Sequence, residues 1–352
     1  MTNPLWHSIQ TQGPGTVAVM GMSKNTGKTV ALNHLLAQAH AASTMVGVTS
    51  IGRDGEERDQ VYQIPKPPVR VWSRSLVATA RGTLARAKVR TKFLAGTGIE
   101  SPMGEIVLVQ VQEPGEMEIA GASRSSDLRR VITRLQQCGA SLVLLDGALG
   151  RSHHTSPAIA DGVLLATGAA LGGGIRDVLR KTRDRLAILS IEQADPALRQ
   201  RCALLFEQGG VALWDRHDQL VFSAPIATLN AGEALLQYAN LQLATVALTG
   251  AVGSSLWAVL KTLATRHPGL AIVVTDGTKL FVDASELAAL QRLGARVQAF
   301  SAIRLLGITL NPFSPFGGSF DAADFLRAAR SALAGTTVCD VVLEEQEFGV
   351  TT

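Results

Sequence analysis

Residues 21–29 read GMSKNTGKT and stand between a short apolar run and a segment with helical periodicity. The run TVAVM at 16–20 is rich in β-branched residues, which is typical of a buried strand. After the loop, Leu32, Leu36 and Ala39 recur with the spacing of one helical face. A GKT sequence between a strand and a helix predicts a loop that binds the phosphates of a nucleotide, and we call residues 21–29 the GKT loop.

Such a loop binds phosphates through its backbone N–H groups, through the N-terminus of the following helix and through a few side chains. We expect Gly27 to let the backbone approach the phosphates, Lys28 to reach the β- and γ-phosphates, and the Thr29 hydroxyl to bind Mg²⁺. Lys28 is therefore also a predicted catalytic residue. The predicted nucleotide-binding residues are Gly21, Ser23, Lys24, Asn25, Thr26, Gly27, Lys28, Thr29 and Val30.

The first glycine of the loop departs from the usual spacing. The ordinary motif has a glycine at the position of Met22, whereas the glycine here is Gly21, one residue earlier. The surrounding strand and helix still favour nucleotide binding over a purely structural turn.

Two carboxylates are predicted to bind the metal ion. The apolar run LVLLD at 142–146 ends in Asp146, and an acid at such a strand end holds Mg²⁺ beside the phosphates of a bound nucleotide. A second strand at 44–49 leads into the sequence SIGRDGE, where Asp54 is expected to bind Mg²⁺ or to orient the attacking water and Arg53 to steady developing charge. The alternatives are a helix cap or ion-pair partner for Asp146 and an exposed turn acid for Asp54.

Two further segments carry residues that could belong to a functional site. Arg151, His153 and His154 follow the sequence DGA, and they predict a polar, switch-like loop because no third metal ligand stands at a useful spacing. The segment LTGAVGSS at 248–255 also joins a strand to a helix but has no lysine. It predicts an ordinary turn in which Ser254 or Ser255 caps the helix, with an anion or partner contact as the alternative.

The alternation of strands and helices predicts an α/β protein whose mostly parallel sheet is flanked by helices, as in P-loop NTPases. Residues 1–64 would hold the GKT loop and the second strand, 65–121 a β-rich insertion, and 122–240 the remainder of the core. Residues 241–352 would form either a second small α/β domain or the far half of one sheet.

Composition narrows the function classes. The net charge is +4 and aromatic residues make up 5%, which argues against a stacking surface for single-stranded nucleic acid. The basic group at 81–92 predicts a solvated edge. Three distant cysteines predict buried thiols in a reducing compartment, and neither a secretory signal nor a membrane span is evident. We expect a cytoplasmic protein with no nucleic-acid or membrane partner.

The sequences GMSKNTGKT, TSIGRDGE and LLDGALGR resemble the SIMIBI class of P-loop proteins, which includes dethiobiotin synthase, MinD-like ATPases and metallochaperone GTPases. The extra lysine of that class matches Ser23 in this chain, while Lys24 lies one residue later. The chain has no NKxD sequence of the kind that GTPases use, which favours ATP.

Longer stretches, including PKPPVRV, SPAIADGVLLATGAAL and GITLNPFSPFG, resemble the KamB family, the ATPase-like subunits of the lysine 5,6-aminomutase reactivase. The resemblance implies an ATP- and Mg²⁺-dependent chaperone that expels damaged cobalamin from an adenosylcobalamin-dependent aminomutase, together with a second reactivase subunit. The alternatives are a dethiobiotin-synthase-like ligase or kinase acting on a small carboxylate, and a nucleotide-binding scaffold that does not hydrolyse ATP. A homodimer is an alternative assembly.

Overall fold

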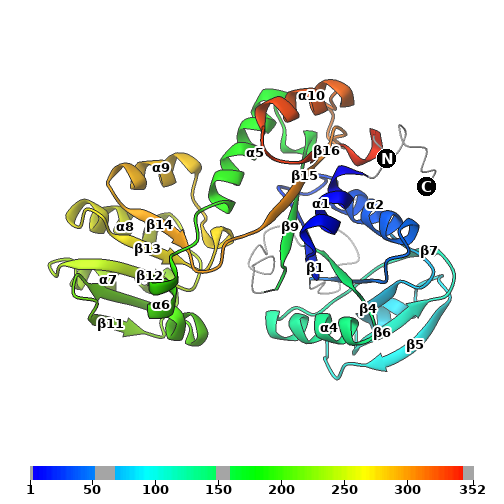
Figure 1. Ribbon diagram of the computed structural model, residues 1–352, viewed down its shortest axis with the longest axis horizontal. Helices are drawn as coiled ribbons and strands as arrows, with labels where there is room; N and C mark the ends of the chain where they lie inside the picture. The colour runs from blue at the N-terminus through cyan, green and yellow to red at the C-terminus, as the bar shows by residue number, and fades with distance from the viewer. Residues whose placement is uncertain (1–2, 52–67, 148–158, 344–352) are drawn as a thin grey trace. The chain divides into compact units, whose positions relative to one another are not determined.

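The computed structural model describes residues 3–51, 68–147 and 159–343 of the chain (Figure 1). The chain divides into two compact units. Unit 1 is Met1–Arg180 with Leu305–Thr352, and unit 2 is Lys181–Arg304. Unit 2 is therefore inserted into the sequence of unit 1, and the helix α5 (Ile175–Leu189) spans the point where the chain leaves unit 1.

Unit 1 is built on a nine-stranded sheet with the order β16-β15-β9-β1-β8-β2-β4-β6-β5. The pairs from β16 to β4 are parallel, and β6 is antiparallel to both β4 and β5. Figure 1 shows β9 beside β1, although the two strands are far apart in the sequence. The strands are β1 (Thr16–Gly21), β2 (Val46–Ser50), β4 (Leu76–Ala80), β5 (Thr91–Gly96), β6 (Ile106–Val111), β8 (Leu142–Asp146), β9 (Gly162–Gly168), β15 (Leu305–Asn311) and β16 (Val338–Cys339).

Helices cover both faces of this sheet. On one face, α1 (Pro4–Gln12) and α2 (Lys28–Ala41) pack against alternate residues of the central strands, such as Val17 and Val19. On the other face, α4 (Ser125–Gln137) packs on the intervening residues, such as Ala18. Because both faces are covered, β1, β2, β8 and β9 are apolar and almost completely buried. The helix α10 (Ala322–Ala332) and the short α3 (Arg81–Leu84) complete the unit's helices among the described residues.

The stretch 65–121 is rich in strands, as the sequence predicts, but it does not form a separate layer. β4 pairs with β2 of the core, and β6 and β5 continue the same sheet to its edge. Two short strands, β3 (Val69–Val71) and β7 (Gly115–Met117), pair with each other. The alternating pattern identified these strands, but it carries no information about which strand each one pairs with.

Unit 2 is a smaller α/β unit with a five-stranded sheet in the order β11-β10-β12-β13-β14. β12, β13 and β14 are parallel, whereas β10 is antiparallel to β12 and forms an antiparallel hairpin with β11. The strands are β10 (Val211–Asp215), β11 (Leu220–Ala224), β12 (Leu243–Leu248), β13 (Ala271–Val274) and β14 (Arg296–Ala299). The helices are α6 (Pro196–Gln208), α7 (Gly232–Gln237), α8 (Ser254–Arg266) and α9 (Ala284–Arg292).

The two units divide the chain differently from the sequence-based boundaries at 121 and 240. β10 and β11, placed in the core by the sequence, pair within unit 2, while β15 and β16, placed in the C-terminal part, join the large sheet of unit 1. Both alternatives for residues 241–352 thus hold in part: one segment belongs to a second small α/β unit, and another completes the large sheet. Only the pairing of distant strands decides between them, and that pairing is not visible in local periodicity.

Candidate nucleotide-binding site

The GKT loop lies at the carboxyl end of β1, and its last residues open α2. The sequence-predicted order of strand, loop and helix is confirmed, because β1 ends at Gly21 and α2 begins at Lys28. Gly27 precedes the helix with φ +88°, a left-handed conformation that favours glycine. No side chain caps the N-terminus of α2. The first turn therefore offers its N–H groups to an anion from outside the helix.

The side chain of Lys28 folds back over the GKT loop and contacts its backbone. Its Nζ donates a hydrogen bond to the carbonyl oxygen of Ser23 at 3.2 Å, and Thr26 Oγ1 donates to the same oxygen at 2.9 Å. A Cβ atom added at Gly21 would stand 2.7 Å from Lys28 Nζ and 2.8 Å from its Cδ and Cγ atoms. The early glycine therefore leaves room for the lysine side chain, which gives its unusual position a physical reason.

The remaining predicted residues of the loop differ in exposure. Thr26 is fully buried and Thr29, in the first turn of α2, is 5% exposed. Lys24 and Asn25 are exposed at the loop tip, and Val30 is 36% exposed. Ser23 is half-buried, and its Oγ donates a hydrogen bond to the carbonyl oxygen of Lys24 at 2.9 Å. Within this segment, Thr26 and Thr29 are thus the buried residues, and the loop tip is exposed.

Asp146 ends β8, the strand next to β1, and it is buried. Its Cα pairs with that of Val19 on β1 and with that of Ser50 on β2. The amide of Gly147 donates to the carbonyl oxygen of Val19 at 3.1 Å, and the amide of Ile51 donates to the carbonyl oxygen of Asp146 at 3.1 Å. This carboxylate therefore lies at the edge of the sheet from which the GKT loop begins.

The order of the strands places a topological switch point at this edge. From β1 the chain passes through α2 to β2 on one side, and from β9, the other neighbour of β1, it goes on to β15 on the opposite side. Open α/β sheets bind ligands outside the carboxyl ends of the strands at such a switch point. The GKT loop lies at this place, together with the uncapped N-terminus of α2 and the buried carboxylate of Asp146.

A residue without a predicted role, Asn311, also belongs to this edge. It ends β15, and its side-chain Nδ2 donates a hydrogen bond to the carbonyl oxygen of Asn25 in the GKT loop at 2.8 Å. A Cβ atom added at Gly27 would stand 3.0 Å from Asn311 Cβ. A polar residue at the end of an apolar strand was the available signal, the same signal that identifies Asp146.

The chemistry of these residues fits a magnesium–nucleotide complex. In proteins Mg²⁺ takes one or two side-chain oxygens and completes its shell with water and phosphate oxygens, and Thr29 and Asp146 supply such oxygens. Within residues 3–51, 68–147 and 159–343, no group of three or more His, Cys, Asp or Glu side chains could hold a metal ion by itself. Asp54, Arg53, Arg151, His153 and His154 lie outside the described residues.

The second glycine-rich segment, at 248–255, is a packed turn of unit 2. The helix α8 begins at Ser254 after the N-cap Gly253, and no side chain caps it, so the predicted cap by Ser254 or Ser255 is wrong. Thr228 Oγ1 donates to the carbonyl oxygen of Ala251 at 2.6 Å, and a Cβ atom at Gly250 would stand 2.4 Å from this Oγ1. The glycine is thus explained by contacts inside the unit, in agreement with an ordinary turn.

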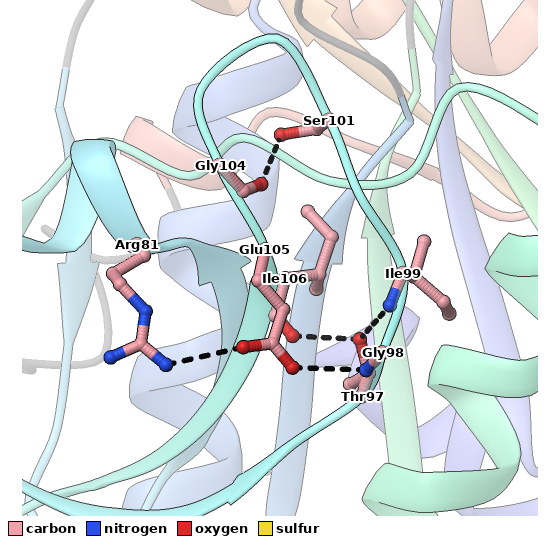
Figure 2. A network of polar contacts seen from close by, with 8 residues as sticks. All are labelled: Arg81, Thr97, Gly98, Ile99, Ser101, Gly104, Glu105 and Ile106. Carbon is pink, nitrogen blue, oxygen red and sulfur yellow. Dashed lines mark hydrogen bonds and ion pairs between the residues drawn. The ribbon is translucent and has the colours of Figure 1, made fainter.

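Three exposed arginines of the basic group at 81–92 form ion pairs with glutamates. Figure 2 shows Arg81 donating to Glu105 at 3.1 Å, while the amide of Gly98 donates to the same carboxylate at 2.9 Å. The Gly98 amide, followed by the Arg81 guanidinium, lowers the pKa of Glu105. Arg86 and Arg90 pair with Glu118 and Glu113. Most of the positive charge here is balanced locally, as the solvated-edge interpretation requires.

No helix in the described part of the chain is long and apolar enough to cross a membrane. No family model matches the chain, and no curated protein or solved structure matches it either.

Proposed function

We propose that this chain binds ATP with Mg²⁺ through the GKT loop and hydrolyses it. The observation that carries the proposal is the joint position of the loop and of Asp146. The loop opens an uncapped helix at the switch point of the sheet, and the carboxylate ends the neighbouring strand.

In this proposal each residue has a distinct part. The N–H groups of the loop and of the first turn of α2 bind phosphate oxygens. Lys28 exchanges its hydrogen bond to the Ser23 carbonyl for the β- and γ-phosphates, and so neutralises charge that grows during the reaction. Thr29 and Asp146 would hold Mg²⁺, which would supply positive charge to stabilise the phosphate oxygens during the reaction.

Hydrolysis joins a water oxygen to the γ-phosphorus and breaks the bond between that phosphorus and the bridging oxygen of ADP. The attacking water gives up one proton, which passes to the solvent, and ADP and inorganic phosphate are released. We assign the orientation of this water to Asp54, on the basis of its sequence position after β2. The absence of an NKxD sequence supports ATP as the nucleotide.

We further propose that hydrolysis drives work on a partner protein, as the reactivase resemblance implies: release of damaged cobalamin from an adenosylcobalamin-dependent aminomutase, assisted by a second subunit. The inserted unit 2, with its own sheet and core, offers surface beyond what a phosphate site needs. A chaperone that couples hydrolysis to binding needs states with different partner affinities.

The experiment is steady-state ATP hydrolysis by the purified chain, alone, with the candidate partner and aminomutase, and with a panel of small carboxylates. We expect slow hydrolysis by the chain alone and stimulation by the protein partners. Stimulation by a carboxylate, with a phosphorylated or cyclised product, would replace the chaperone proposal by a synthase-like one. No hydrolysis under any condition would favour a nucleotide-binding scaffold.

A further inference from the structure

The side chain of Asn311 is held from both ends of its amide group. Nδ2 donates to the carbonyl oxygen of Asn25 at 2.8 Å, and Oδ1 accepts a hydrogen bond from the amide of Phe313 at 3.2 Å. Because the oxygen is engaged by an N–H donor, the nitrogen is the end that faces the GKT loop. This residue is therefore fixed in one orientation, not merely close to the loop.

The backbone of Asn311 is fixed as well. Its Cα pairs with that of Gly168 at the end of β9, and a Cβ atom at Gly168 would stand 2.2 Å from the Asn311 carbonyl oxygen. Only a glycine leaves room for this approach. Asn311 consequently lies between two glycines, Gly168 of β9 and Gly27 of the GKT loop.

The carbonyl that Asn311 holds belongs to a residue in an unusual conformation. Asn25 has φ +61°, a left-handed value that asparagine tolerates better than most residues. A loop that turns successive N–H groups inward toward an anion must turn its carbonyls outward, where they need donors. The Asn311 amide supplies such a donor at the loop tip.

We infer that Asn311 is a positioning residue for the nucleotide site, a latch that holds the tip of the GKT loop in the shape that receives phosphates. This inference rests on the proposed function. Ordering a loop on binding costs conformational entropy, so a loop held beforehand binds more tightly. Asn311 itself need not touch the nucleotide.

Two variants test the latch, with one matched control. Asn311→Ala removes both hydrogen bonds, whereas Asn311→Asp keeps an acceptor for Phe313 and loses the donor to Asn25. Ser319→Ala is the control, since it removes a hydrogen bond within the same segment, from the amide of Ser314 to Ser319 Oγ at 3.0 Å. Circular dichroism and melting temperature establish that each variant folds.

The first measurement is amide hydrogen exchange of the peptide covering residues 21–30 in the nucleotide-free protein. We expect faster exchange in Asn311→Ala and Asn311→Asp and no change in Ser319→Ala. Unchanged exchange in both Asn311 variants would overturn the latch, whether or not the protein binds ATP.

The second measurement is the affinity for MgATP together with steady-state kinetics. Loss of the hydrogen bond to Asn25 is expected to weaken ATP binding by both Asn311 variants roughly 3- to 10-fold and to raise KM similarly, with kcat nearly constant. An equal loss in Ser319→Ala would reduce Asn311 to a general structural role. If the wild-type protein bound no ATP, the proposed function would fail, while the exchange experiment would still decide the latch.

Discussion

At the scale of single residues, the site consists of side chains whose positions have local physical causes. Lys28 lies across Gly21 because a glycine leaves room there, and Asp146 is buried because β8 is a central strand of a sheet covered on both faces. Substitutions at these residues can therefore distinguish a role in nucleotide binding from a role in packing.

Gly21→Ala is expected to weaken MgATP binding roughly 10-fold while the protein stays folded. The new Cβ atom would lie within 2.8 Å of the lysine side chain, so Lys28 would have to move. Gly253→Ala is the matched control, because a Cβ atom there meets nothing within 4 Å and the residue also precedes a helix. Calorimetric titration compares the two, and equal affinities would contradict the spatial role given to Gly21.

Asp146→Asn is expected to lower kcat for ATP hydrolysis about 100-fold and to change ATP affinity much less. The amide keeps the shape of the carboxylate but loses the charge assigned to Mg²⁺, whose effect is largest in the transition state. Single-turnover hydrolysis and equilibrium binding give the two quantities. Normal hydrolysis by a folded variant would reassign Asp146 to a structural role.

At the scale of elements, the first residues of α6 and α9 allow the stabilising effect of a helix cap to be measured. Asp195 caps α6, where its Oδ1 accepts a hydrogen bond from the amide of Leu198 at 2.8 Å. Asp283 stands at the equivalent position of α9 but makes no side-chain cap hydrogen bond. The two aspartates thus share a unit and a position and differ in one interaction.

Asp195→Ala is expected to lower the free energy of unfolding of unit 2 by about 1 kcal/mol. Asp283→Ala should change it by less than about 0.5 kcal/mol, since no cap hydrogen bond is lost. Urea unfolding followed by circular dichroism gives both values. Similar losses in the two variants would show that the cap hydrogen bond is not what stabilises α6.

The elements around the GKT loop were predictable from sequence because their signals are local. The strand β1, the helix α2 and the strand β8 ending in Asp146 each follow from the residue pattern within one short window. The position of Asn311 at the end of an apolar strand was a local signal, but its contact with Asn25 was not predictable, because it joins positions 286 residues apart. Strand pairing in the large sheet was hidden for the same reason.

At the scale of the whole molecule, the insertion of unit 2 between α5 and β15 is the main feature that local patterns could not reveal. Both units alternate strands and helices. The sequence pattern therefore does not change where unit 2 begins, near residue 181, or where the chain re-enters unit 1, near residue 305. The return strand β15 then carries Asn311 to the GKT loop, so residues on both sides of the insertion build one site.

The three cysteines report on the folded state of both units. Cys138 is exposed at the end of α4, whereas Cys202 and Cys339 are buried, and burial raises the pKa of Cys202 to about 11. Since the thiolate is the reactive form, Cys202 stays protonated and protected near pH 8. We expect rapid labelling of Cys138 alone in the native protein and of all three thiols in urea. Rapid native labelling of Cys202, located by mass spectrometry, would contradict the packing of unit 2.

The most direct test of the central claim is calorimetric titration of the wild-type chain and of Lys28→Ala with ATP in the presence of Mg²⁺. We predict saturable binding by the wild type and at least about a 100-fold loss of affinity in Lys28→Ala with an unchanged melting temperature, because the proposed partners of Lys28 are phosphates and not core residues. Equal affinity of the two proteins for ATP, or no binding by the wild type, would contradict the assignment of residues 21–29 as a phosphate-binding loop.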